Sequence, residues 1–383
     1  MKIIVVGLGE AGRSLIKLLD GSDHDITVID KDRACVDMIT DKYTVNGVCG
    51  SGASIETLTK AGADTADVLV ALTHTDEINL LACMQAKVVG TRLTCARVLM
   101  PDLADEKDKL KEEYNIDYLI SPKEDLAKEI YRNIGLPGYV KIENCLNDEV
   151  YVLDLNAVGD SPLIGRSIAD IRTGISENMF IGVIVRGKKT IVPKDSDVVA
   201  ENDSLYIVVY KEHLGEIFTS LGIKRCKTGN IAIVGGGITG ACLADMLTED
   251  KKKLTILDDD LNRCRELMER YPNVRIAYAE GDITEVLDEE HVDRSDAIIS
   301  LTDNDETNLV ISMYAWSKGV KSVITRVDRQ VHVKLLHRVN IDITVSPTEL
   351  CVFSIMRFIN TASGRSGDEH ADVLEFIGDL RRF

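Results

Sequence analysis

Short apolar runs alternate with longer stretches of helical periodicity along the first 120 residues of the chain. The apolar runs, rich in Val, Ile and Leu, lie near residues 2–6, 25–30, 44–48, 67–72, 93–98 and 117–120. Strands that are buried on both faces of a parallel sheet typically show near-continuous apolar runs of this kind. The alternation therefore predicts βαβ units, with parallel strands in one sheet and helices between them.

The same pattern occurs a second time in residues 228–360. The segment IIVVGLGEAG at 3–12 returns as IAIVGGGITG at 231–240, and LTHTDEIN at 72–79 returns as LTDNDETN at 301–308. The matched positions lie 228 or 229 residues apart, so only small insertions or deletions separate the copies. The chain therefore contains two copies of one α/β unit, called copy one and copy two below.

The segment between the copies, about 140–222, has a different pattern of apolar and polar residues. Strand-like runs lie at 149–155, 180–185, 190–192 and 204–210, with turn signals at Arg186-Gly187 and Asn202-Asp203. Such a pattern predicts a small α+β domain that contains a hairpin. The Gly- and Pro-containing segment 135–138 and residues 224–230 are the expected linkers.

Each copy begins with a Gly-x-Gly-x-x-Gly turn between its first strand and first helix. In such a turn the first glycine permits the tight bend, the second lets a pyrophosphate approach the backbone, and the third lets helix and strand pack closely. The alternative is a tight turn that binds nothing, but the motif occurs twice in the same context. The three glycines are Gly7, Gly9 and Gly12 in copy one, and Gly235, Gly237 and Gly240 in copy two.

An acidic residue ends the second strand of each copy, 23 residues after the first glycine. The residue is Asp30 in copy one and Asp258 in copy two. A carboxylate at this position accepts hydrogen bonds from ribose hydroxyls and repels a 2′-phosphate. The pattern therefore favours NAD(H), ADP or ATP over NADP(H) as the ligand.

The two copies differ in charge around this motif. Arg13 follows the third glycine in copy one, where it either reaches a terminal phosphate or lies on the surface, and Ala241 takes its place in copy two. Copy two also carries the run Asp258-Asp259-Asp260 where the nucleotide would lie. We therefore expect the second site to be degenerate or to take a different ligand.

Further candidates follow the fourth and fifth strands, at the carboxyl edge where such sheets bind ligands. The two threonines after the fourth strand either contact a ligand or cap the next helix. The two arginines that end the fifth strand contact a phosphate or a partner, or form ordinary ion pairs. His74 is the one histidine we place at this edge, and copy two has Asp303 there. The paired candidates are Thr73 with Thr302 and Arg97 with Arg326.

Composition narrows the possible functions. The 383 residues include 45 Lys and Arg against 63 Asp and Glu, a net charge of −18, which argues against non-specific binding to nucleic acid or anionic membrane. No apolar run approaches the ~18 residues of a membrane span, and the chain opens directly on its first strand and glycine turn. Nine scattered cysteines without a C-x-x-C pair indicate reduced thiols and no metal site. We expect a soluble, cytosolic protein.

Catalytic residues are not evident in the sequence. No Tyr-x-x-x-Lys pair, nucleophile elbow or metal triad is present where chemistry would occur, and the histidines offer no obvious general acid or base. The pattern therefore favours a nucleotide sensor. The alternatives are an NAD-dependent oxidoreductase and a structural scaffold whose nucleotide sites are inactive.

Taken together, these motifs resemble the TrkA family, the cytosolic regulatory subunits of Trk-type potassium uptake systems, which are built from RCK (or KTN) domains. The resemblance rests on GLGEAGR at 7–13 with Asp30, on the duplicated Leu-Thr-x-x-Asp-Glu-x-Asn, and on SPLIGRSI at 161–168 and IGVIVRG at 181–187. It implies a Rossmann-like domain at 1–138, an RCK C-terminal subdomain at 139–224, a second Rossmann-like domain at 228–362, and a short tail at 363–383. The expected fold class is α/β, with two doubly wound parallel sheets and a small α+β subdomain between them.

The resemblance also implies function. Family members are non-enzymatic subunits that bind NAD(H) and adenine nucleotides (ATP, ADP), self-associate as dimers and tetramers, and gate a membrane-spanning potassium subunit from the cytoplasmic face. No nucleic-acid partner is expected. The implied nucleotide residues are Gly7, Leu8, Gly9, Glu10, Ala11, Gly12, Arg13, Asp30, Gly50, Ser51, Thr73 and Arg97 in copy one, and Gly235, Gly237, Ile238, Thr239, Gly240, Asp258, Gly281, Asp282, Thr302 and Arg326 in copy two.

One departure from the family pattern concerns the end of the chain. The family pattern has a second C-terminal subdomain after copy two, and the roughly 20 residues that remain here are too few to form one. The resemblance therefore implies either a truncated chain or a naturally short variant. Both leave open how a ring would assemble through that subdomain.

Overall fold

The computed structural model describes residues 1–100, 103, 106–146, 149–187, 189–329, 332–333, 335–336, 341 and 343–362. Copy one forms a six-stranded parallel sheet in the order β3-β2-β1-β4-β5-β6. The order reverses between β1 and β4, which is where doubly wound sheets bind their ligands. The strands are β1 (Lys2–Val6), β2 (Asp25–Asp30), β3 (Asn46–Cys49), β4 (Val68–Ala71), β5 (Leu93–Arg97) and β6 (Tyr118–Ile120).

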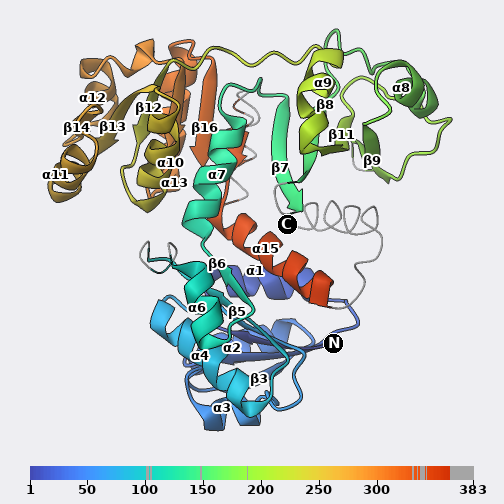
Figure 1. Ribbon diagram of the computed structural model, residues 1–383, viewed down its shortest axis with the longest axis vertical. Helices are drawn as coiled ribbons and strands as arrows, with labels where there is room; N and C mark the ends of the chain where they lie inside the picture. Colours follow the sequence, from blue (N-terminus) through green and yellow to red (C-terminus); the bar gives the residue numbers. More distant parts are fainter. Residues whose placement is uncertain are drawn as a thin grey trace. The chain divides into compact units, whose positions relative to one another are not determined.

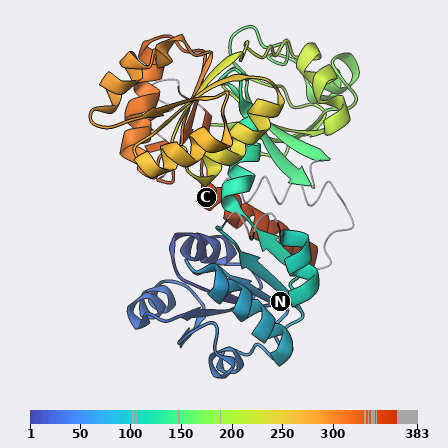
Figure 2. The same cartoon turned by 60° about the vertical axis from the view of Figure 1, so that its left-hand side comes forward.

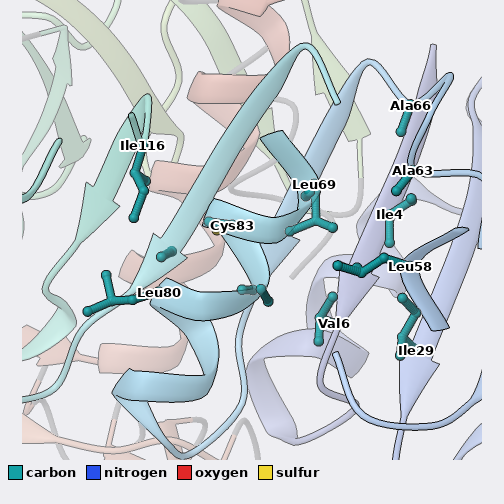
Figure 3. Packing of buried hydrophobic residues seen from close by; sticks show 14 of the residues in the cluster. Ile4, Val6, Ile29, Leu58, Ala63, Ala66, Leu69, Leu80, Cys83 and Ile116 are labelled. Carbon is teal, nitrogen blue, oxygen red and sulfur yellow. The ribbon is translucent and has the colours of Figure 1, made fainter. Parts of the chain in front are cut away.

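Helices cover both faces of this sheet (Figures 1 and 2). One face packs against helices α3, α4 and α6, and Figure 3 shows the shared core, where Leu58 of α3 lies among Ile4, Val6 and Ile29 of the strands and Leu80 of α4 lies farther along, toward Ile116. Alternate strand residues point to the other face. The helices are α1 (Glu10–Leu19), α2 (Arg33–Lys42), α3 (Ile55–Lys60), α4 (Asp76–Val89), α6 (Lys107–Tyr114) and α7 (Pro122–Asn133).

Copy two repeats the arrangement with the sheet order β14-β13-β12-β15-β16-β17. Its strands are β12 (Asn230–Val234), β13 (Lys253–Asp258), β14 (Arg275–Tyr278), β15 (Ala297–Ser300), β16 (Ser322–Arg326) and β17 (Ile343–Val345). Its helices are α10 (Ile238–Glu249), α11 (Leu261–Arg270), α12 (Ile283–Glu289), the 3-10 turn η2 (Val292–Arg294), α13 (Asp305–Ser317) and α15 (Pro347–Ala362). The predicted duplication and the α/β fold class are confirmed.

The middle segment forms an antiparallel sheet in the order β10-β9-β11-β8-β7. The sequence pattern did not predict β7, because a bulge between Asn144 and Leu146 interrupts the alternation of apolar and polar residues. The strands are β7 (Val140–Leu146), β8 (Val150–Asn156), β9 (Phe180–Arg186), β10 (Lys189–Ile191) and β11 (Ser204–Tyr210). The helices are α8 (Ile168–Gly174), the 3-10 turn η1 (Lys211–His213) and α9 (Leu214–Ser220).

The compact units of the chain do not follow the order of the repeat. Residues 1–125 form one unit with α15, although α15 follows the last strand of copy two. Within this unit α15 packs on α1 (Figure 1). The rings of Tyr118 and Phe358 stack there, with centroids 5.2 Å apart. Residues 126–346, which include most of α7, form the other unit, where Tyr131 donates a hydrogen bond to Asp250 (2.8 Å). The final helix of each copy therefore belongs to the unit that contains the other copy's sheet.

The described ranges hold neither a candidate membrane-spanning helix nor a candidate metal site. No helix in them combines the length and the apolar character that a membrane span requires. The same ranges contain no group of three or more His, Cys, Asp or Glu side chains arranged to hold a metal ion. The predicted tail at 363–383 lies outside the described residues, and the predicted domain boundaries stay a prediction.

Candidate nucleotide-binding sites

The first glycine of each turn is required by the backbone. Gly7 has φ +97° and Gly235 has φ +110°, conformations that residues with a side chain rarely adopt. A Cβ built on Gly7 would lie 2.8 Å from the nitrogen of Thr73. The close approach of the β1–α1 turn to the end of β4 therefore depends on glycine at this position.

The second and third glycines have different roles. A Cβ on Gly12 would lie 2.0 Å from the carbonyl oxygen of Gly7, and one on Gly240 would lie 2.2 Å from that of Gly235, so the third glycine serves helix packing. A Cβ on Gly237 would meet no heavy atom of the described residues within 4 Å, whereas one on Gly9 would lie 3.2 Å from Nε2 of His74. In copy two the second glycine therefore borders open space at the N-terminus of its helix, as an approaching pyrophosphate requires. In copy one an imidazole lies beside it.

The helix N-terminus beside this space is suited to an anion. The first N–H groups of α1 and α10 have no partner within their helices, and the helix dipole places partial positive charge there. Leu8, Glu10 and Ala11 form the turn and first helical positions in copy one, and Ile238 and Thr239 open α10 in copy two. The structure thus brings the predicted glycine-turn residues together in each copy.

The acidic residue at the end of the second strand is held in the same way in both copies. Asp30 Oδ2 accepts a hydrogen bond from the N–H of Leu8 (2.7 Å) and Oδ1 accepts one from Asp32 (2.9 Å). Asp258 accepts the equivalent bonds from Gly236 (2.6 Å) and Asp260 (2.9 Å). Because a carboxylate has about four acceptor positions, each can still accept ribose hydroxyls. The carboxylate and the glycine turn are therefore fixed to each other before a ligand binds.

A buried asparagine positions the turn that follows the fourth strand. Asn79 Oδ1 accepts hydrogen bonds from the N–H (2.8 Å) and the hydroxyl (2.7 Å) of Thr73, and Nδ2 donates to the carbonyls of Thr73 (2.9 Å) and Arg97 (2.9 Å). In copy two, Asn308 bonds to Thr302 and Arg326 in the same pattern. Sequence reasoning assigned no role to this asparagine, although its fixed spacing from the threonine in both copies was a usable signal.

The alternative role of the threonines as helix caps is wrong. The N-cap residues of α4 and α13 are Thr75 and Asn304, two positions later than Thr73 and Thr302. The threonine hydroxyls instead donate to the buried asparagines. Each threonine therefore lies at the carboxyl edge of the sheet. Its bonds to the asparagine, together with the bond from the asparagine to the arginine carbonyl, join the ends of the fourth and fifth strands; we call this set of bonds the asparagine clamp.

The predicted arginines lie at the same edge in different environments. Arg13 Nε donates to the carbonyl of Leu8 (2.7 Å), and no ion pair of Arg13 is recorded among the described residues. Arg97 Nη2 donates to the carbonyls of Leu72 and Thr73, both at 3.0 Å. Arg326 instead forms an ion pair with Asp303 (2.6 Å). The cationic groups are therefore more available to an anion in copy one than in copy two.

The turn after the third strand differs in register between the copies. The N–H of Gly50 donates to the carbonyl of Asp30 (2.9 Å), and the residue that makes this bond to Asp258 is Ala279 (2.8 Å). Gly281 therefore lies two positions beyond the equivalent of Gly50. Asp282 is the N-cap of α12, where its side chain accepts from Thr284.

The fold and the two sites together define a duplicated Rossmann-type nucleotide-binding protein with a small antiparallel domain between its copies. The family models confirm this class: the TrkA-N domain matches residues 3–122 and 231–347, and the TrkA-C domain matches 157–222. These matches cover well over half of the chain, and the chain belongs to the TrkA family. The resemblance inferred from the motifs is thereby confirmed.

Full-length relatives agree with this assignment. The chain is 30% identical over 366 residues to the Trk system potassium uptake protein TrkA of Vibrio alginolyticus, covering 94% of this chain and 80% of the relative. It is 31% identical over 389 residues to the TrkA homolog 2 of Methanosarcina mazei, covering 98% and 86%. The TrkA protein of Haemophilus influenzae is 30% identical over 387 residues, covering 98% and 84%.

Solved structures with the same fold include RCK proteins with bound nucleotides. The structure of the GsuK channel bound to NAD has a TM-score of 0.67 at 19% identity, and the match covers 95% of this chain. The structure of GsuK bound to ADP has a TM-score of 0.59 at 14% identity, with 95% coverage. The chain spans 64% of the NAD-bound GsuK chain and 70% of the ADP-bound one. NAD and ADP are among the ligands that the sequence predicts for this chain.

Proposed function

We propose that this protein is a nucleotide-sensing regulatory subunit of a potassium uptake system. The observation that carries the proposal is the duplicated site, in which a carboxylate is bonded to a glycine turn at the N-terminus of a helix. Membership of the TrkA family supports the connection to potassium uptake. Each copy would hold one nucleotide at the carboxyl edge of its sheet.

The ligands that fit these sites are NAD(H), ADP and ATP. The helix N-terminus would hold the phosphates, and Asp30 or Asp258 would hold the ribose hydroxyls while repelling a 2′-phosphate. Arg13, Thr73 and Arg97 would add contacts on the phosphate side of copy one. Gly50 and Ser51 would line the adenine side of that site, with Gly281 and Asp282 near the corresponding turn of copy two.

The proposed role is regulatory, without turnover of the nucleotide. The bound cofactor supplies hydride chemistry only when a general acid or base and a second substrate face it. The described carboxyl edge of copy one presents Thr73, His74 and Arg97, and copy two replaces the histidine with Asp303. An oxidoreductase would consume NADH with a carbonyl substrate, so that assay separates the two functions.

The partner we infer is a membrane-spanning potassium-translocating subunit, with the protein on the cytoplasmic side and self-associated as dimers or tetramers. A ligand shifts such an assembly only through its different affinity for the two states. A 10-fold preference for one state supplies ~1.4 kcal/mol per site, so several sites in one assembly would be needed for a firm switch. Gating therefore requires ligands that discriminate between states.

Calorimetric titration of the full chain tests the proposal. We expect NADH, NAD⁺, ADP or ATP to bind without turnover. Asp30→Ala should remove binding at copy one and Asp258→Ala binding at copy two, each leaving the other site. Loss of both sites in either variant would indicate misfolding, which circular dichroism would reveal. A folded wild-type protein that binds none of the four nucleotides would overturn the sensor and favour the scaffold.

A further inference from the structure

The imidazole of His74 lies against the second glycine of the copy-one turn. A Cβ built on Gly9 would lie 3.2 Å from His74 Nε2 and 3.7 Å from Cε1, and apart from Gly9 and its two chain neighbours no other heavy atom of the described residues lies within 4 Å of that position. His74 is exposed, and the imidazole has no hydrogen-bond partner among the described residues. The ring therefore lies at the opening that the bare glycine leaves for a pyrophosphate.

The equivalent residue of copy two is arranged differently. Asp303 directs its carboxylate to Arg326, with 2.6 Å between Oδ1 and Nη1, and no heavy atom from the described part of the chain lies within 4 Å of a Cβ built on Gly237. In copy one Arg97, the equivalent of Arg326, bonds to two main-chain carbonyls and has no acidic partner in the described part of the chain. At the phosphate side, copy one therefore has a nitrogen donor where copy two has a carboxylate.

We propose that His74 is a ligand-contacting residue that makes nucleotide binding at copy one depend on proton uptake, whereas copy two lacks this dependence. The inference rests on the proposed function, since it concerns the same site. The Nε2–H group of the protonated ring would donate a charge-assisted hydrogen bond to a pyrophosphate oxygen. Histidine is the side chain that changes charge between pH 5 and 8, so binding at copy one would strengthen as the pH falls.

Other charged groups around the ring do not account for such a dependence. The elements that meet there carry Glu10 and Arg13 on α1, Asp76 and Glu77 at the start of α4, and Arg97 at the end of β5. Carboxylates and guanidinium groups ordinarily keep their charge between pH 6 and 8. Asp76 is also engaged elsewhere, since its Oδ2 accepts from the N–H groups of Leu99 (2.7 Å) and Met100 (2.8 Å).

The experiment is calorimetric titration with NAD⁺ at pH 6.0, 7.0 and 8.0, in two buffers of different ionisation enthalpy. NAD⁺ is used because its diphosphate has no terminal phosphate that titrates in this range, unlike ADP. The full chain carries Asp258→Ala, so that copy one is observed alone. We expect NAD⁺ affinity to rise on the order of 10-fold from pH 8.0 to 6.0, with net proton uptake, because one charge-assisted hydrogen bond is gained. His74→Asn should bind with nearly the same affinity at all three pH values.

His24→Asn is the matched control, because His24 precedes β2 at the opposite edge of the same sheet and should leave the pH dependence intact. Equal affinity at pH 6.0 and 8.0 in the parent, or a pH dependence that survives His74→Asn, would overturn the inference and leave the sensor standing. If the parent shows no binding that Asp30→Ala removes, both the sensor at copy one and this inference are overturned. The reciprocal change, Asp303→His with Asp30→Ala, should create a pH dependence at copy two.

Discussion

Asn79 and Thr73 are joined by three hydrogen bonds of 2.7 to 2.9 Å, made by a side-chain amide that is fully buried. The relationship recurs between Asn308 and Thr302. It explains why the motif Leu-Thr-x-x-Asp-Glu-x-Asn is present twice: the asparagine fixes the loop at the carboxyl edge where the nucleotide would bind. This motif, one of those on which the family resemblance rests, therefore stabilises the loop through the hydrogen bonds of its asparagine.

Replacement of the asparagine should be costly. Asn79→Ala leaves several buried polar groups without partners, and we expect it to lower the free energy of unfolding by about 2–4 kcal/mol. Thr73→Val, which removes only the bonds of the hydroxyl to Asn79 and to the main chain of Thr75, should cost about 1 kcal/mol. Urea denaturation measures both. Equal stability of Asn79→Ala and wild type would show that the clamp contributes nothing.

Two glycines of copy two should separate ligand binding from stability. Gly237 has φ −61°, which alanine tolerates, and its Cβ would point into open space. Gly237→Ala should therefore keep the wild-type unfolding midpoint and weaken nucleotide binding at copy two. Gly240→Ala, whose Cβ would lie 2.2 Å from a carbonyl oxygen, should instead destabilise the fold by about 2 kcal/mol or more. A Gly237→Ala protein with undiminished binding would contradict our placement of the phosphates.

A partly buried group of charges in the middle sheet should make stability depend on pH. Burial, and after it the negative charge of Glu143, raise the pKa of Asp154 to about 7, although Lys141 and the hydrogen bond with Tyr206 act in the opposite direction. Lys141 is already bonded to the carboxylates of Glu129 (3.1 Å) and Glu143 (2.8 Å). It therefore cannot neutralise all three acids.

Proton linkage gives the direction in which Asp154 makes stability change with pH. Because the native pKa of Asp154 exceeds that of the unfolded chain, the folded state holds the extra proton between about pH 4 and 7, and its stabilising contribution is lost as the pH rises through 7. Asp154→Asn should therefore gain stability relative to wild type as the pH rises from 5 to 8, by at most about 1.4 kcal/mol per unit. Urea midpoints of both proteins across this range provide the test, and a constant difference would refute it.

The middle domain also contains a bidentate ion pair between Arg186 and Asp203. Arg186 donates to both carboxylate oxygens of Asp203, at 2.8 and 2.7 Å, and these bonds hold the pKa of that buried carboxyl below its usual value. Arg186→Met should cost about 3 kcal/mol, because it leaves the buried carboxylate without its cation. Combining it with Asp203→Asn should recover part of the loss. Denaturation at pH 7 measures the three variants, and additive losses in the double variant would argue against direct coupling.

The local elements of this protein were predictable from the sequence. The strands of both sheets, the duplicated glycine turn and the acid that follows it were all predicted, because runs of apolar residues and the backbone freedom of glycine are properties of neighbouring residues. The turn signals at Arg186-Gly187 and Asn202-Asp203 also predicted the hairpin region correctly. Strand β7 was not predicted, because its bulge interrupts the alternation of apolar and polar residues on which such a prediction depends.

Only the tertiary structure decided which distant groups meet. The pattern of α15 indicates an apolar helix, but it does not say that the helix packs on α1 of the other copy, because either sheet offers an apolar face. In the same way, only folding brings the side-chain amide of Asn79 to the carbonyl of Arg97 and the imidazole of His74 to Gly9. Local periodicity depends on the chain itself, whereas these contacts depend on long-range packing, which sequence neighbours do not encode.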